Sequence, residues 1–230
     1  MAGITTRAID SVENVAMNWR PVLLCALIVV TLWHTWQQWA LRAIHPPDGQ
    51  IAPYDPLQTN LDDAPIERLG HWQLKQRARY DITARILSRE DYRFDQLAAL
   101  VPEDLALGWG PMSDNRILKG FEITQSARFY SWRPRGALSI ARQEVIEHSA
   151  NTHVIPANEM VRAQLKHLRV GQVVRLRGTL VDGFRDDGAY VNTSLTRSDS
   201  GAGSCEIVLV DTVDNQPSLA LTAVWLTLGR

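Results

Sequence analysis

Cysteine is scarce in this chain, and neither sign of charge predominates. The 230 residues include two cysteines, Cys25 and Cys205, which lie far apart and belong to no CxxC pair. This excludes a disulfide framework and the common structural zinc sites. Lys and Arg total 24 against 25 Asp and Glu, so the basic excess of a dedicated nucleic-acid-binding protein is also absent.

The chain also has only one long apolar run. A polytopic membrane protein would need several such runs, so that class is excluded. The run PVLLCALIVVTLW covers Pro21–Trp33, and the chain stays uncharged as far as Leu41. A helix of this length matches a hydrocarbon core of ~30 Å at a rise of about 1.5 Å per residue. Tryptophans flank the run, as they do at membrane interfaces: Trp19 at one end, and Trp33, Trp36 and Trp39 at the other.

We therefore predict a tail at residues 1–20 and an uncleaved transmembrane helix at 21–41 that contacts the lipid bilayer. The long lead and the poor cleavage site at Leu41–Ala43 disfavour a signal peptide. A buried core helix would leave the tryptophans unexplained. Arg7 and Arg20 on one side, against Arg42 on the other, predict that the N-terminus stays inside and the large domain lies beyond the membrane.

Residues 42–69 are predicted to form a proline-rich linker. Five prolines between Ile44 and Pro65 disfavour both helix and sheet. An extended spacer of this kind would hold the following domain away from the bilayer.

Residues 70–230 are predicted to form a mainly β (α+β) domain. Asn158–Leu168 has helical spacing with Asn158 as its N-cap, and the last apolar stretch, Leu219–Leu228, fits either a strand or a helix. The predicted order is a long strand, further strands, one helix and then a β-meander. This order resembles the OB-fold, a five-stranded barrel with a helix between its third and fourth strands. Alternating apolar and polar residues predict the strands: His71–Phe94, Phe121–Trp132, Gln172–Val181, Ala189–Leu195 and Cys205–Val213.

Three segments resemble those of an uncharacterised family of bacterial proteins with a single membrane anchor. They are GWGPMSD (Gly108–Asp114), HSANTHVIPA (His148–Ala157) and SLTRSDSGAGSCE (Ser194–Glu206). The resemblance implies an inner-membrane protein with a cytoplasmic N-terminus and a periplasmic C-terminal domain. Because that family has no assigned activity, it implies no catalytic residue.

His148 and His153 are the candidate metal ligands, with Glu147 or Asn151 as oxygen donors if the segment is a loop. Two histidines without a third ligand at a recognised spacing are a weak zinc motif. A loop held by hydrogen bonds between side chains and backbone is the favoured interpretation, and no metal or cofactor is predicted.

Cys205 is expected to be a half-buried strand residue rather than a nucleophile, because a reactive thiol needs neighbours that the sequence does not identify. The glycine-rich segment Ser198–Ser204 is expected to connect two strands rather than to bind phosphate, since no helix follows it.

Trp109, Trp132, Arg175 and Arg177 are the candidate binding surface. Exposed aromatic rings and basic strands could stack single-stranded nucleic acid, but the acidic balance of the domain argues against that. The alternatives are an ordinary solvated face for the arginines and a Trp109 folded over the open end of the barrel.

These observations predict a membrane-anchored, extracytoplasmic binding or assembly module without catalytic activity. Its expected partner is another membrane or envelope protein. One alternative is a metal-assisted hydrolase that uses His148 and His153. Another is an OB-type nucleic-acid-binding domain on the cytosolic side.

Overall fold

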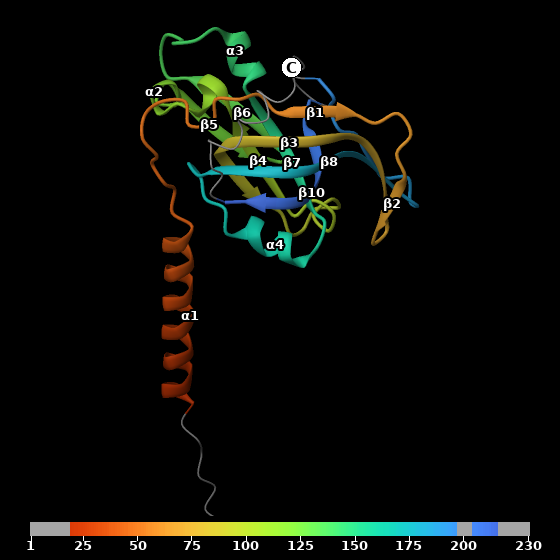
Figure 1. Ribbon diagram of the computed structural model, residues 1–230. Coiled ribbons are helices and arrows are strands. Elements are labelled where there is room, and N and C mark those ends of the chain that lie inside the picture. Colours follow the sequence, from red (N-terminus) through yellow and green to blue (C-terminus); the bar gives the residue numbers. More distant parts are fainter. Residues whose placement is uncertain (1–18, 197–203, 216–230) are drawn as a thin grey trace, which may run out of the picture. The chain divides into compact units, whose positions relative to one another are not determined.

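The computed structural model describes residues 19–196 and 204–215, and it is mainly β with short helices (Figure 1). The chain divides into two compact units, Met1–Ala40 and Leu41–Arg230. In the first unit, the described residues form the helix α1, Arg20–Ala40. The second unit holds all the described strands and the remaining helices.

Apolar side chains of α1 are exposed around the whole helix. Leu23, Val29 and Leu32 are among the most exposed, each at more than 60%. Among the described residues, however, no helix combines the length and the apolar character that a membrane span requires.

The second unit is built around a closed ring of five strands. Each strand pairs with the next in the order β3-β4-β7-β10-β8, and β8 returns to pair with β3 along most of its length. The pairs are antiparallel except for β7 and β10, which are parallel. The ring strands are β3 Trp72–Asp91, β4 Glu103–Gly108, β7 Ser149–Pro156, β8 Val173–Arg185 and β10 Glu206–Asp214.

The helix α4, Glu159–Lys166, connects β7 to β8, the third and fourth ring strands along the chain. The domain is thus mainly β with a few helices, as predicted from the sequence. Asn158 caps α4 by accepting a hydrogen bond from the Val161 backbone at 3.0 Å, as predicted. Val161 and Leu165 of α4 join the core inside the ring.

The barrel core follows from alternation along the strands. On β3, Tyr80, Ile82 and Ala84 point inward, whereas Asp81 and Thr83 between them are only half-buried. Gly178 on β8 allows the backbone of β10 to approach, since a Cβ atom there would lie 1.9 Å from the Leu209 carbonyl oxygen.

Two strands lie inside residues 42–69, the segment predicted to be a proline-rich linker, so an extended spacer does not describe these two stretches. The strands are β1, Leu57–Asn60, and β2, Ile66–Leu69, and both pair with β3. Ala52 is buried, and its carbonyl accepts a hydrogen bond from Gly110 N at 2.8 Å. The prolines of this segment do not prevent β1 or β2 from pairing with β3. Neither strand contains a proline, and each lies at an edge of the sheet, where proline nearby is tolerated.

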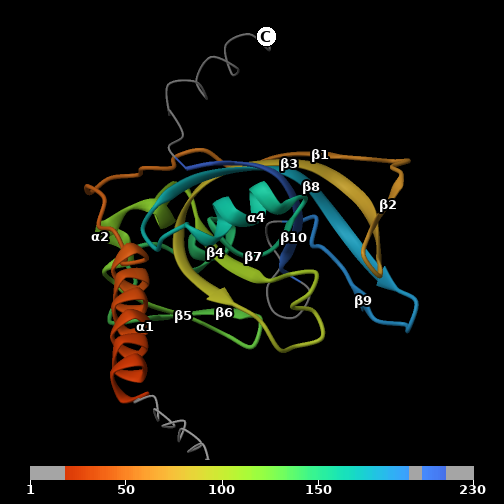
Figure 2. The same cartoon turned by 90° about the horizontal axis from the view of Figure 1, so that it is seen from below.

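An extension of four strands continues from the barrel, at the right of Figures 1 and 2. The start of β3 and the end of β8 pair with each other, and they are flanked by β2 and by β9, Tyr190–Val191. One face of this extension is buried: Trp72 and Leu74 pack with Leu100 and Val101 of the segment between β3 and β4.

A hairpin covers another part of the outer barrel surface. The single strand predicted for Phe121–Trp132 is in fact β5, Phe121–Ser126, and β6, Phe129–Pro134, which pair as a separate sheet. Ala127 and Arg128 make the turn with φ angles of 50° and 71°. Three short helices lie near this hairpin in the chain: η1 Gly110–Ser113, α2 Asn115–Leu118 and α3 Arg142–Glu147.

Candidate functional site

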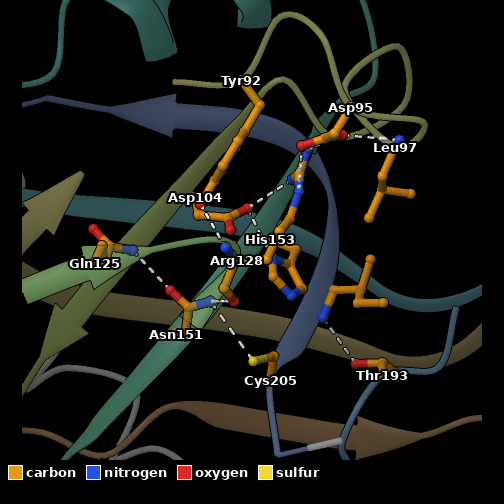
Figure 3. A network of polar contacts seen from close by, with 11 residues as sticks. Tyr92, Asp95, Leu97, Asp104, Gln125, Arg128, Asn151, His153, Thr193 and Cys205 are labelled. Carbon is orange, nitrogen blue, oxygen red and sulfur yellow. Dashed lines mark hydrogen bonds and ion pairs between the residues drawn. The ribbon is translucent and has the colours of Figure 1, made fainter. Parts of the chain in front are cut away.

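The site lies on the outer surface of β4 and β7, beneath the β5–β6 hairpin. Asp104 on β4 and His153 on β7 are register partners in the antiparallel pair. Their neighbours Leu105 and Val154 belong to the inner core, so alternation directs Asp104 and His153 outward. Figure 3 shows these side chains with the residues that surround them.

Asp104 and His153 form a buried pair. His153 Nδ1 lies 2.7 Å from Asp104 Oδ1, and Asp104 is fully buried while His153 is 9% exposed. The Cys205 thiol is the other group that acts on the imidazole and raises its pKa. Burial lowers the pKa of His153, but the hydrogen bonds and charges of Asp104 and Cys205 outweigh it and raise the pKa to about 9.

Arg128 holds the other side of Asp104. Its Nη1 lies 3.2 Å from Asp104 Oδ1, and its Nη2 donates to both carboxylate oxygens of Asp95 at 2.8 and 2.9 Å. The guanidinium carbon stacks 3.7 Å from the centre of the Tyr92 ring, a cation–π arrangement. The left-handed backbone of the hairpin turn brings Arg128 to this position.

Asn151 links the hairpin to the sulfur. It is two residues before His153 on β7, so both side chains point to the same outer face. Gln125 Nε2 donates to Asn151 Oδ1 at 2.8 Å, which orients the amide. The Asn151 Nδ2 group then donates to the Arg128 carbonyl at 3.0 Å and lies 3.6 Å from Cys205 Sγ.

Tyr92 is held close to the same cluster. Its hydroxyl oxygen accepts a hydrogen bond from the Arg128 backbone N–H at 2.9 Å. Burial is the main cause that raises the pKa of Tyr92 to about 12, so this group stays neutral near pH 7. The cluster thus aligns a carboxylate, an imidazole and a thiol, supported by one guanidinium and one amide.

The structure separates the two histidines that the sequence suggested as a pair. The segment predicted to be a loop is the strand β7, in which every residue is buried. His148 ends α3 instead, with its Nδ1 at 2.8 Å from the Glu144 carbonyl. Within the described ranges, no group of three His, Cys, Asp or Glu side chains could hold a metal ion, so the metal-site hypothesis has no ligand set here.

The two candidate tryptophans do not form one surface. Trp109 is 1% exposed and belongs to the barrel core, and its Nε1 donates to Asp55 at 3.1 Å. Trp132 on β6 is half-buried and packs edge-on against Phe121 at 5.6 Å between ring centres.

The two candidate arginines also differ in environment. Arg175 makes a two-pronged contact with Asp81 at 2.8 and 2.7 Å. Arg177 is exposed and is the register partner of Asp81 on β3. Most of the Ser198–Ser204 segment lies outside the described residues, as does Leu219–Leu228.

Sequence reasoning did not connect Asp104 or Arg128 with this site, and it treated Cys205 as a half-buried strand residue. The available signal was the spacing of the polar residues Asn151 and His153, two positions apart as on one strand face. Comparisons with family models, curated proteins and solved structures gave no match.

Proposed function

We propose that this protein is a membrane-anchored binding module, in which α1 enters a lipid bilayer and the barrel domain binds another membrane or envelope protein. The observation that carries the proposal is the exposure of apolar side chains around α1. Leu23 is 67% exposed, Leu27 63% and Val30 63%. Exposed apolar surface of this extent is a marker of contact with lipid or protein.

The interfacial aromatic residues support the same interpretation. Trp19 precedes α1, and Trp33, Trp36 and Trp39 lie in its second half, each exposed by 59% or more. Tryptophan side chains favour the headgroup region of a bilayer. The strongly apolar part of the helix ends near Trp33, so we place the tryptophans beyond that point at the interface.

The proposed protein-binding surface is the exposed face of the four-stranded extension. Phe184 and Tyr190 are opposite each other on β8 and β9, 5.7 Å apart between ring centres, and are 41% and 57% exposed. Ile66 is 59% exposed and lies on the same face by strand register. Aromatic residues of this kind are enriched at protein interfaces.

Flotation with phospholipid vesicles tests the membrane anchor. The full chain is expected to float with vesicles, and Leu27→Lys together with Val30→Lys is expected to abolish this, because each charge opposes insertion. His34→Lys, near the polar end of the same helix, serves as the matched control and should still float. Retention of the Leu27→Lys, Val30→Lys variant on vesicles would contradict the anchor.

Photo-crosslinking in cells tests the binding surface. A photoreactive residue at Tyr190 is expected to give a discrete adduct with a membrane or envelope protein. The same residue at Met160, which is 74% exposed on α4, is the control and should not give that adduct. Equal labelling at the two positions would argue against a specific surface.

A further inference from the structure

We propose that Cys205 is the nucleophile of a thiol-dependent acyl-transfer site, with His153 as its acid–base group and Asp104 as a positioning residue. This inference is independent of the proposed function, because neither α1 nor the face of Phe184 and Tyr190 takes part. The substrate class is an activated acyl compound, an ester or a thioester, and water completes the turnover.

The backbone fixes the position of the sulfur. Cys205 directly precedes β10, and its carbonyl accepts a hydrogen bond from Ser194 N at 2.9 Å. Ile207, two residues later, donates from its backbone to Thr193 Oγ1 at 3.0 Å (Figure 3). Cys205 as a residue is half-buried rather than buried, and the proposal requires that an acyl group reach its sulfur from solvent.

The imidazole is oriented as a nucleophilic site requires. Asp104 occupies Nδ1 at 2.7 Å, which leaves Nε2 as the other ring nitrogen. The register of β7 and β10 pairs His153 with Ile207, two residues after Cys205, and Asn151 on the same face lies 3.6 Å from the sulfur. A nucleophile next to a base that a third group orients is the general arrangement of covalent acyl transfer. Arg128 keeps Asp104 in place, since both its Asp104 and Asp95 contacts hold the same guanidinium.

The Asn151 amide adds a second donor to the sulfur. Its Nδ2 lies 3.6 Å from Cys205 Sγ, and Gln125 and the Arg128 carbonyl fix its orientation. A structural thiol in an apolar core needs no such polar neighbours. Here, two polar side chains of β7 converge on one sulfur.

In the first step, the Cys205 thiol gives its proton to His153 and its Sγ forms a bond to the acyl carbon, while the C–O or C–S bond to the leaving group breaks. The electron pair of the broken bond goes to the leaving atom, which takes that proton from His153. In the second step, water forms a C–O bond to the acyl carbon while His153 accepts a proton from the water. The Cys205 Sγ–C bond breaks, its electron pair returns to sulfur, and the sulfur takes the proton from His153 as the carboxylic acid leaves, so that the sum is acyl hydrolysis.

Acetylation by p-nitrophenyl acetate tests the proposal with the full chain in mild detergent. In a Cys25→Ser background, one acetyl group per chain is expected on Cys205, found by peptide mass spectrometry, together with a burst of p-nitrophenolate. The matched Cys25→Ser, Cys205→Ser variant has no thiol and should show neither the adduct nor the burst. Cys205 in protein unfolded by urea should react about a hundredfold more slowly than in folded protein, the size of a typical acid–base contribution.

Variants of the cluster separate catalysis from packing. His153→Gln should lower the acetylation rate about a hundredfold, whereas the control His148→Gln should leave it unchanged. Asp104 and Cys205 act on His153 directly, whereas Arg128 contacts Asp104 and is itself held by Asp95 and Tyr92. Asp104→Asn should move the His153-dependent limb of the pH–rate profile to lower pH, whereas a purely structural defect would lower the rate equally at all pH values.

Circular dichroism and thermal unfolding confirm that each variant is folded. If Cys205 reacts no faster in folded protein than in protein unfolded by urea, or if His153→Gln leaves the rate unchanged, the cluster is a structural hydrogen-bond network and the proposal fails. Flotation with vesicles is unaffected by either outcome, so failure here is distinguishable from failure of the membrane anchor.

Discussion

Two ionisable side chains on the barrel, His153 and Glu103, are buried beside groups of opposite charge, and their protonation is coupled to folding. His153 lies on the outer surface between Asp104 and Cys205. Glu103 belongs to the inward-facing series of β4, where Arg89 Nη2 approaches it to 3.2 Å. Arg89 also donates to the Leu168 carbonyl at 2.5 Å.

Stability should depend on pH through His153. Its pKa is raised to about 9, above the ordinary value of about 6.5, so the folded state binds this proton more tightly. The resulting stabilisation is complete below about pH 6.5 and is lost as pH rises through about 9. Urea unfolding across this window should show a smaller decline for His153→Gln than for the wild type, and parallel curves would contradict the coupling.

Glu103 should contribute in the same direction over a more acidic window. Burial raises its pKa to about 8 despite the opposing charge of Arg89. Stabilisation by the protonated carboxyl is complete below 4.5, the ordinary value, and is lost as pH rises through about 8. Glu103→Gln should therefore resist alkali better than the wild type in thermal melts. Glu159→Gln, whose side chain is 88% exposed, should show no such change.

At the scale of elements, the sequence predicted what local patterns determine. The alternation of β3, the N-cap of α4 and the strand β10 all follow from neighbouring residues, and the structure confirms them. The strand β7 could not be predicted in this way. Its outward residues Ser149, Asn151 and His153 are polar, and their partners come from the distant hairpin and β4.

The β5–β6 hairpin escaped prediction for a related reason. Its turn residues, Ala127 and Arg128, are not the Gly, Asn or Asp that normally mark a left-handed turn. Contacts of Arg128 with Asp95 and Asp104 offset the strain, and these depend on the folded barrel. The Cys205 cluster was missed with the hairpin, because Arg128 and Gln125 complete it.

The hairpin turn is expected to tolerate glycine better than alanine. Ala127 is exposed and has a φ of 50°, which costs an L-residue roughly 1–2 kcal/mol. Glycine removes that cost but adds about 0.5–1 kcal/mol of unfolded-state entropy. Ala127→Gly should thus raise the free energy of unfolding by about 0.5 kcal/mol. Ala99→Gly, at an exposed position without a positive φ, should lower it.

Closure of the barrel should depend on Gly178. A Cβ atom there would lie 1.9 Å from the Leu209 carbonyl oxygen, so the β8 and β10 backbones would have to separate. Gly178→Ala should cost about 1–3 kcal/mol in denaturant unfolding. Gly136→Ala, where a Cβ would meet nothing within 4 Å, is the control, and an equal effect of the two would contradict the close approach.

On the scale of the whole molecule, the stability of the domain and its attachment to membranes should be separable. The two compact units divide after Ala40, and the inner core residues all come from the second unit. A chain that begins at Leu41 should therefore unfold with a Tm within about 2 °C of the full chain, less than the shift expected from about 1 kcal/mol.

The same truncated chain should lose vesicle binding completely, because it lacks the exposed apolar side chains of α1. It should still acetylate Cys205 with p-nitrophenyl acetate at the full-length rate, since the thiol, His153 and Asp104 all lie in the second unit. Differential scanning calorimetry, flotation and acetylation on one preparation measure the three properties. A lower Tm would show that the barrel depends on the helix, and it would contradict an anchor whose only role is to hold a self-sufficient domain at a bilayer.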